Sequence, residues 1–200
     1  MTQTYPDHPN LNDNYAPLRM ECEVNDLIVE GEIPQDLYGS FYRNGPDPQF
    51  PPLGQYHWFG GDGMVHAFHF ENGKISYLNR WSKTSKWLQE RKAGKSLIDG
   101  LNPMNSDPQW NPEGSDGTAN TNIIFHAGKL LALEEGHVPF ELDPITLESK
   151  GAYDYGGKLK SPMTAHPKID PVSGDMYGFS YTAENFFSSK MSYFVINSVG

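Results

Sequence analysis

His166 is the side chain of this 200-residue sequence whose surroundings point most clearly to chemistry. It lies in the stretch SPMTAHPKIDP, residues 161–171, directly before a proline. A residue before proline is held in an extended conformation, because the proline ring clashes with a helical neighbour. A neutral imidazole is a common metal ligand and proton carrier. A lone histidine is more often structural than a ligand, so the residues alone favour a structural turn here, and a metal-binding role is the alternative.

The other histidines form no metal-binding pattern. No two of them have the helical spacing of a zinc-protease site, and His66 and His69 are expected on opposite faces of one strand. We assign none of the following to a metal: His8, His57, His66, His69, His126 and His137. Cys22 is the single cysteine, which excludes an internal disulfide and a thiolate metal cluster and suits a reducing compartment.

The stretch WFGGDGMVHAF, residues 58–68, predicts a tight glycine-rich turn. In one interpretation Asp62 caps its own backbone within a structural turn. In the other the turn lines a cavity, with Trp58 and Phe59 as apolar walls.

Glu134 and Glu135 are adjacent at the end of a predicted strand. Because side chains alternate along a strand, at most one of the two is expected to point inward. A buried glutamate needs a hydrogen-bond donor, and the N–H of a metal-bound histidine would be one.

Short alternating runs bounded by Gly, Pro, Asn and Asp predict an all-β chain. Asn72-Gly73 predicts a hairpin turn, and residues 82–101 predict a helix or two helical turns. Residues 126–151 and 166–196 resemble each other, as propeller blades do. We expect an extended arm over residues 1–19 and a partial β-propeller over residues 20–200, with a cap at about 82–116. The strands suffice for about three blades, fewer than a closed propeller needs, which indicates part of a longer protein or an unusual small β protein.

The charge and hydropathy pattern limits the partners. The sequence has 15 basic and 25 acidic residues, net −10, and no basic run that would follow a nucleic acid backbone. The N-terminus lacks the pattern of a signal peptide, and no apolar run is long enough to span a membrane. We therefore expect a soluble, cytoplasmic protein without nucleic acid partners.

Five motifs in order, from about residue 27 to residue 183, resemble those of the carotenoid cleavage oxygenase family: EIPQDLYGSFYRNGP, WFGGDGMVHAF, ANTNIIFHAGKLLALEEG, ELDPITLE and TAHPKIDPVSGDMYGF. Members of that family are much longer, and the motifs resemble only the front part. The resemblance implies a seven-bladed β-propeller with a small helical and loop cap. On its axis the family holds a non-haem Fe(II) with four histidines.

The resemblance also implies site residues. The TAHP motif carries the first iron ligand, which is His166 here, and the other three are expected after residue 200. In the family, glutamates accept from the outer N–H of ligand histidines, and Glu135 is similar to the first of them. Thr121 resembles a residue whose methyl group crowds an open iron position. The substrate tunnel is expected to include Trp58, Phe59 and Leu101. Four neutral imidazoles leave two iron positions for O₂ and substrate.

The implied reaction is addition of O₂ across an interior double bond of a lipophilic conjugated substrate, giving two carbonyl products. Stilbene-cleaving members hold a phenol with a tyrosine and a lysine, which this sequence replaces with Leu101 and Glu134. An acidic residue does not stabilise a phenolate, so a carotenoid or apocarotenoid is favoured and a stilbene is the alternative.

Other interpretations stay open at this point. One is isomerisation and hydrolysis of a retinyl ester, another a non-catalytic propeller fragment that serves as a scaffold, and a third a hydrolase using Asp62 with Glu135. A helix with Trp87 and Leu88 among lysines would also suit a peripheral membrane contact. The alternative for that helix is packing on the propeller with a solvated outer face.

Overall fold

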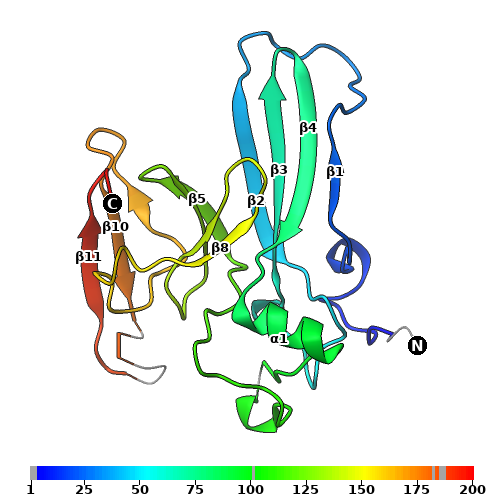
Figure 1. The fold of residues 1–200 in the computed structure, drawn as a ribbon, viewed down its shortest axis with the longest axis vertical. Coiled ribbons are helices and arrows are strands. Elements are labelled where there is room, and N and C mark those ends of the chain that lie inside the picture. Colours follow the sequence, from blue (N-terminus) through cyan, green and yellow to red (C-terminus); the bar gives the residue numbers. More distant parts are fainter. Residues whose placement is uncertain (1–3, 101, 182, 185–187) are drawn as a thin grey trace.

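The computed structural model describes residues 4–100, 102–181, 183–184 and 188–200, and its strands form three antiparallel sheets (Figure 1). The first sheet has the order β1-β4-β3-β2, with β1 (Cys22–Val24), β2 (Gly39–Pro46), β3 (Gly63–Glu71) and β4 (Lys74–Trp81). The second has the order β5-β6-β7-β8, with β5 (Asn122–His126), β6 (Lys129–Leu133), β7 (Phe140–Leu142) and β8 (Ser149–Ala152). The third has the order β11-β10-β9, with β9 (Lys168–Ile169), β10 (Met176–Ser180) and β11 (Ser192–Ile196).

Turn chemistry sets the hairpin between β3 and β4 where it was predicted. Asn72 and Gly73 both have positive φ values, 51° and 72°, and Glu71 pairs with Lys74 across the turn. Two central residues with positive φ give the turn whose twist matches that of the flanking strands. The predicted resemblance between residues 126–151 and 166–196 is also confirmed, because these segments hold β6 to β8 and β9 to β11.

The second sheet lies between the other two and is packed on both faces (Figure 1). One cluster joins Val65 and Ala67 of β3 to Leu130 and Phe140 of the second sheet. Another cluster joins the opposite face of the second sheet to the third. The outer faces of the first and third sheets keep large apolar side chains exposed, among them Phe41, Tyr193 and Val195. Each sheet is therefore stabilised by its neighbours, as expected of blades in a propeller.

The predicted helix is α1 (Ser85–Ala93), which lies at one end of the first sheet (Figure 1). Thr84 caps its N-terminus by accepting from the Trp87 N–H, and Gly94 ends it in the left-handed conformation. Trp87 is only 7% exposed and packs with Met64 and Trp81, whereas Leu88 is exposed. One side of α1 therefore packs on the first sheet, and Leu88 lies on its exposed side. The described residues also form three short 3-10 helices: η1 (Asp13–Tyr15), η2 (Trp58–Gly60) and η3 (Pro103–Asn105).

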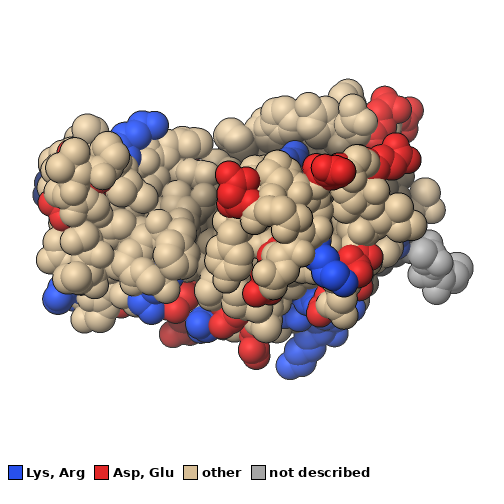
Figure 2. Space-filling model, turned by 90° about the horizontal axis from the view of Figure 1, so that it is seen from above, with Lys and Arg blue, Asp and Glu red and all other residues tan. Residues whose placement is uncertain are grey.

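Charged side chains are interspersed on the face shown in Figure 2, with lysines and arginines beside acidic residues rather than in one basic patch. Among the described residues, no helix combines the length and apolar character needed to cross a bilayer.

The N-terminal arm is packed against the first sheet. Leu11 is buried, the Tyr5 hydroxyl donates to the Pro48 carbonyl, and the Leu18 N–H donates to Asp47 Oδ2 at 3.0 Å. Asp47 Oδ1 is buried and has no hydrogen-bond partner among the described residues. This burial raises the pKa of Asp47 to about 6.

The raised pKa of Asp47 predicts a pH-dependent stability. The folded state holds this proton more tightly than the unfolded state, so the stabilisation present below pH 4 is lost as pH rises through 6. In the full-length protein, the free energy of unfolding of Asp47→Asn relative to that of wild type is expected to rise by up to about 3 kcal/mol from pH 4 to pH 8. Urea unfolding at both pH values measures the change.

Asp143→Asn is the matched control for this pH dependence. Backbone N–H groups of Thr146 and Ile145 lower the pKa of Asp143 to about 2, so its titration window lies below pH 4. The difference in free energy of unfolding between Asp143→Asn and wild type should stay constant from pH 4 to pH 8. An equally flat difference for Asp47→Asn would contradict the prediction.

Candidate metal and substrate site

The backbone around His166 is anchored on both sides. The Thr164 N–H donates to the Phe179 carbonyl at 2.8 Å, and the Thr164 hydroxyl accepts from the His166 N–H at 3.1 Å. The Ala165 carbonyl accepts from the Asn122 side chain at 2.7 Å. The His166 side chain itself is 63% exposed. The buried segment before it thus presents an accessible imidazole.

This imidazole lines a cavity of about 440 Å³ between the second and third sheets and the η2 turn. The structure brings four of the predicted site residues to this cavity: Phe59, Thr121, Glu135 and His166. Trp58 lines a neighbouring cavity instead. Leu101 lies outside the described residues.

Glu135 is the carboxylate nearest to His166, with 3.8 Å between Oε1 and the imidazole Nε2. Its Oε2 atom is buried and has no hydrogen-bond partner among the described residues. A buried carboxylate oxygen without a donor is costly, and the N–H of a histidine ligand is one group that would supply a donor. Burial, the adjacent Glu135 charge and a hydrogen bond to Glu135 raise the pKa of Tyr181, which lines the same cavity. An accessible imidazole beside a partly buried carboxylate fits a metal site with histidine ligands.

Glu134 corrects the expectation that only one of the two glutamates points inward. Strand β6 ends at Leu133, so strict alternation stops before the pair, and both carboxylates line the cavity. Glu134 bonds to Nδ1 of His137. Burial lowers the pKa of His137, but the hydrogen bond and charge of Glu134 outweigh it, so the net pKa is raised. Gly117 makes room for this pair, since a Cβ there would lie 2.3 Å from Glu134 Oε1.

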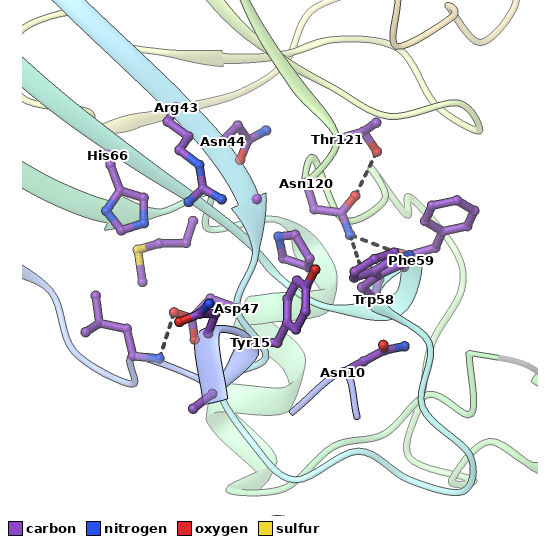
Figure 3. A pocket seen from close by; sticks show the side chains of 16 residues that line it. Asn10, Tyr15, Arg43, Asn44, Asp47, Trp58, Phe59, His66, Asn120 and Thr121 are labelled. Carbon is purple, nitrogen blue, oxygen red and sulfur yellow. Dashed lines mark hydrogen bonds between the residues drawn. The ribbon is translucent and has the colours of Figure 1, made fainter. Parts of the chain in front are cut away.

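A second cavity, of about 510 Å³, lies between the N-terminal arm and the first sheet (Figure 3). Tyr15 of the arm meets Trp58 edge to face, with ring centroids 5.2 Å apart. Phe59, Asn120 and Thr121 line both cavities. The η2 turn and the residues before β5 therefore form a shared partition.

Asp62 does not face the 440 Å³ cavity. Its carboxylate is buried and accepts from Lys86 Nζ at 2.8 Å, and Lys86 also donates to Glu90 at 2.8 Å. The hydrolase hypothesis, which required Asp62 and Glu135 in one pocket, is therefore wrong.

Three cavity residues were missed from the sequence: His57, Asn120 and Tyr181. His57 Nδ1 accepts from the Phe59 N–H at 3.2 Å, so it shapes the turn that carries Phe59. The signal for Asn120 and Tyr181 was their position beside Thr121 in the NTN motif and at the end of a predicted strand. Within the described part of the chain, no three His, Cys, Asp or Glu side chains are placed to hold a metal ion together.

The sheets and this cavity define the class as an all-β protein of propeller-type blades with a histidine and carboxylate site. Residues 15–200 match the family described as "Retinal pigment epithelial membrane protein". The chain therefore belongs to the carotenoid cleavage oxygenase family. Its three sheets correspond to the N-terminal part of the family's seven-bladed propeller.

Individual relatives support this assignment. The chain is 45% identical to a lignostilbene-alpha,beta-dioxygenase isozyme III of Sphingomonas paucimobilis over 98% of this chain and 40% of that protein. A crystal structure of Pseudomonas brassicacearum lignostilbene dioxygenase superposes with a TM-score of 0.93 at 39% identity, over 100% of this chain and 42% of the other. The structure of cobalt-substituted apocarotenoid oxygenase of Synechocystis superposes with a TM-score of 0.73 at 32% identity, over 92% of this chain and 41% of the other. The chain thus spans about two-fifths of the relatives it matches.

Proposed function

We propose that the full-length protein is a non-haem Fe(II) dioxygenase that cleaves an interior double bond of a lipophilic conjugated substrate. The observation that supports this most is the convergence of His166, Glu135, Thr121 and Phe59 on one cavity. One oxygen atom of O₂ would end on each alkene carbon, which gives two carbonyl products and needs no added reductant. Bound Fe(II) would supply the centre at which O₂ is activated.

The roles of the chain's own residues follow from their places. His166 would be one of four histidine ligands, the others coming from beyond residue 200. Glu135 would accept an N–H from a ligand histidine through its buried Oε2 and supply negative charge outside the ligand sphere. Phe59 and the apolar part of Thr121 would keep bulk water from the reacting bond.

The test is metal and product analysis of the full-length protein. We expect about one Fe(II) per chain and, with O₂ in ¹⁸O form, one labelled oxygen in each carbonyl product. A protein that binds no iron, or that yields an alcohol from an ester, would contradict the proposal.

The substrate class depends on the charge of the cavity. Glu134 and Glu135 line it, and no lysine or arginine among the described residues does. An acidic cavity disfavours a phenolate or carboxylate and suits a neutral polyene, so a carotenoid or apocarotenoid remains our first candidate. An aryl alkene is the second, because the Sphingomonas and Pseudomonas relatives are named for lignostilbene.

Glu134→Lys separates these two classes. In the full-length protein it should raise kcat/KM for 4-hydroxystilbene about tenfold or more, because a hydrogen bond to a charged group contributes about 1.5–3 kcal/mol. An apocarotenal without a phenol should gain nothing. Steady-state kinetics on both substrates measures the change.

Glu134→Gln is the control, since it removes the charge and adds no cation. Its kcat/KM for 4-hydroxystilbene should rise much less than that of Glu134→Lys. Equal gains from glutamine and lysine would show that loss of charge alone matters, and the predicted contact would be wrong.

A further inference from the structure

Asn120 lies at the centre of the partition between the two cavities. It directly precedes Thr121 at the start of the second sheet, is only 3% exposed, and its side chain faces the η2 turn (Figure 3). Its chain neighbours are fixed as well, because the Asn44 side chain donates to the Ala119 carbonyl at 2.9 Å.

One end of the Asn120 amide holds the turn that carries Phe59. Its Nδ2 atom lies 3.3 Å from the Trp58 carbonyl oxygen, 3.0 Å from that of Phe59 and 2.7 Å from that of Gly61. Three acceptors around one end of an amide allow only the NH₂ group there, so the orientation of the side chain is determined. The other end must then be the oxygen.

The Asn120 Oδ1 atom determines whether the Thr121 hydroxyl donates or accepts in the hydrogen bond between them. Thr121 Oγ1 lies 3.0 Å from Asn120 Oδ1. Since Oδ1 cannot donate, the threonine hydroxyl must be the donor. Its proton is therefore not available to a molecule in either cavity. Threonine is also branched at Cβ, so fixing the hydroxyl fixes the methyl group.

We infer that Asn120 is a positioning residue for two walls of the reaction cavity. It holds the turn that carries Phe59, and it accepts the hydroxyl proton of Thr121, so that Thr121 presents no hydrogen-bond donor to the cavity. This inference rests on the proposed function for its consequence in catalysis. Water admitted to the cavity, or a proton offered near the reacting oxygen, would divert the reaction, so the orientation of Thr121 matters more than its hydroxyl does.

The test uses the full-length protein with Asn120→Ala and Thr121→Val. Asn120→Ala frees the hydroxyl and the turn, so kcat/KM should fall at least tenfold. In protein loaded with Co(II), its visible absorption should weaken as water adds to the metal. Thr121→Val keeps the branched shape of the side chain and removes its hydrogen bond to Asn120. Its kcat/KM should therefore fall by less than tenfold, and by less than that of Asn120→Ala, because the turn that carries Phe59 is still held. Its melting temperature should also fall, because Asn120 Oδ1 loses its donor.

Two outcomes would overturn the inference. Asn120→Ala could lower the melting temperature and leave both kcat/KM and the Co(II) spectrum unchanged, which is a purely structural role. Thr121→Val could lose as much kcat/KM as Asn120→Ala or more, which means that the hydroxyl acts directly in the cavity. If Asn120→Ala does not fold, a loss of tenfold or more in Thr121→Val alone overturns the inference. The Co(II) spectra compare the variants even if wild-type protein cleaves no substrate tested, so failure of the proposed function is distinguishable.

Discussion

Replacing His166 by alanine in the full-length protein is expected to abolish stoichiometric iron binding and double-bond cleavage together. The imidazole is exposed to the 440 Å³ cavity on an anchored backbone, 3.8 Å from Glu135. Removing a partner outside the ligand sphere of a metal costs about 10–100-fold in affinity or activity. Removing a ligand should cost more than that. Iron content after desalting and product formation at saturating substrate measure the two losses.

Two further variants make the His166 result specific. Glu135→Gln should show the intermediate loss of about 10–100-fold, because it alters a ligand's partner rather than a ligand. His69→Ala should match wild type, since His69 bonds to Ser40 on the first sheet and lines neither large cavity. A His166→Ala protein that retains a full equivalent of iron would refute the ligand assignment.

Local chemistry made parts of this fold predictable from sequence. The Asn72-Gly73 turn is set by two residues that tolerate positive φ. Such signals act within a few residues. These local signals determine the turns even though the sheets that contain them are assembled from distant parts of the chain.

Features that depend on where an element ends were not predictable in the same way. The expectation that Glu134 and Glu135 diverge assumed that β6 continues, but it ends at Leu133. The arm was expected to be extended and polar, yet Leu11 is buried and Tyr15 forms part of a cavity wall. Neither outcome has a local signal, because each depends on surfaces supplied by residues far away in the sequence.

The same limit applies to Asn120. In the sequence it is one polar residue among several in an Asn- and Thr-rich stretch, and only Thr121 drew a functional assignment. Its three carbonyl partners lie about sixty residues earlier, at Trp58, Phe59 and Gly61. A contact of that kind becomes visible only when the η2 turn and the start of β5 are placed side by side.

Lys86→Met is expected to destabilise the full-length protein by about 3–5 kcal/mol. The Lys86, Asp62 and Glu90 side chains are 7%, 1% and 1% exposed. Burial alone would lower the pKa of Lys86, but the two carboxylates raise it above its usual value, so the ammonium stays charged. Methionine would leave both carboxylates buried without a cation. Urea unfolding at pH 7 measures the loss.

Compensating substitutions distinguish this charge effect from lost packing. Combining Lys86→Met with Asp62→Asn and Glu90→Gln removes every buried charge, and replacing a whole buried ion group is often close to neutral. Most of the lost stability should therefore return. Lys83→Met removes an exposed partner 3.6 Å from Glu21 and should cost no more than about 1 kcal/mol. If the triple variant is as unstable as Lys86→Met, the aliphatic contacts of Lys86 rather than its charge stabilise the junction between α1 and the η2 turn.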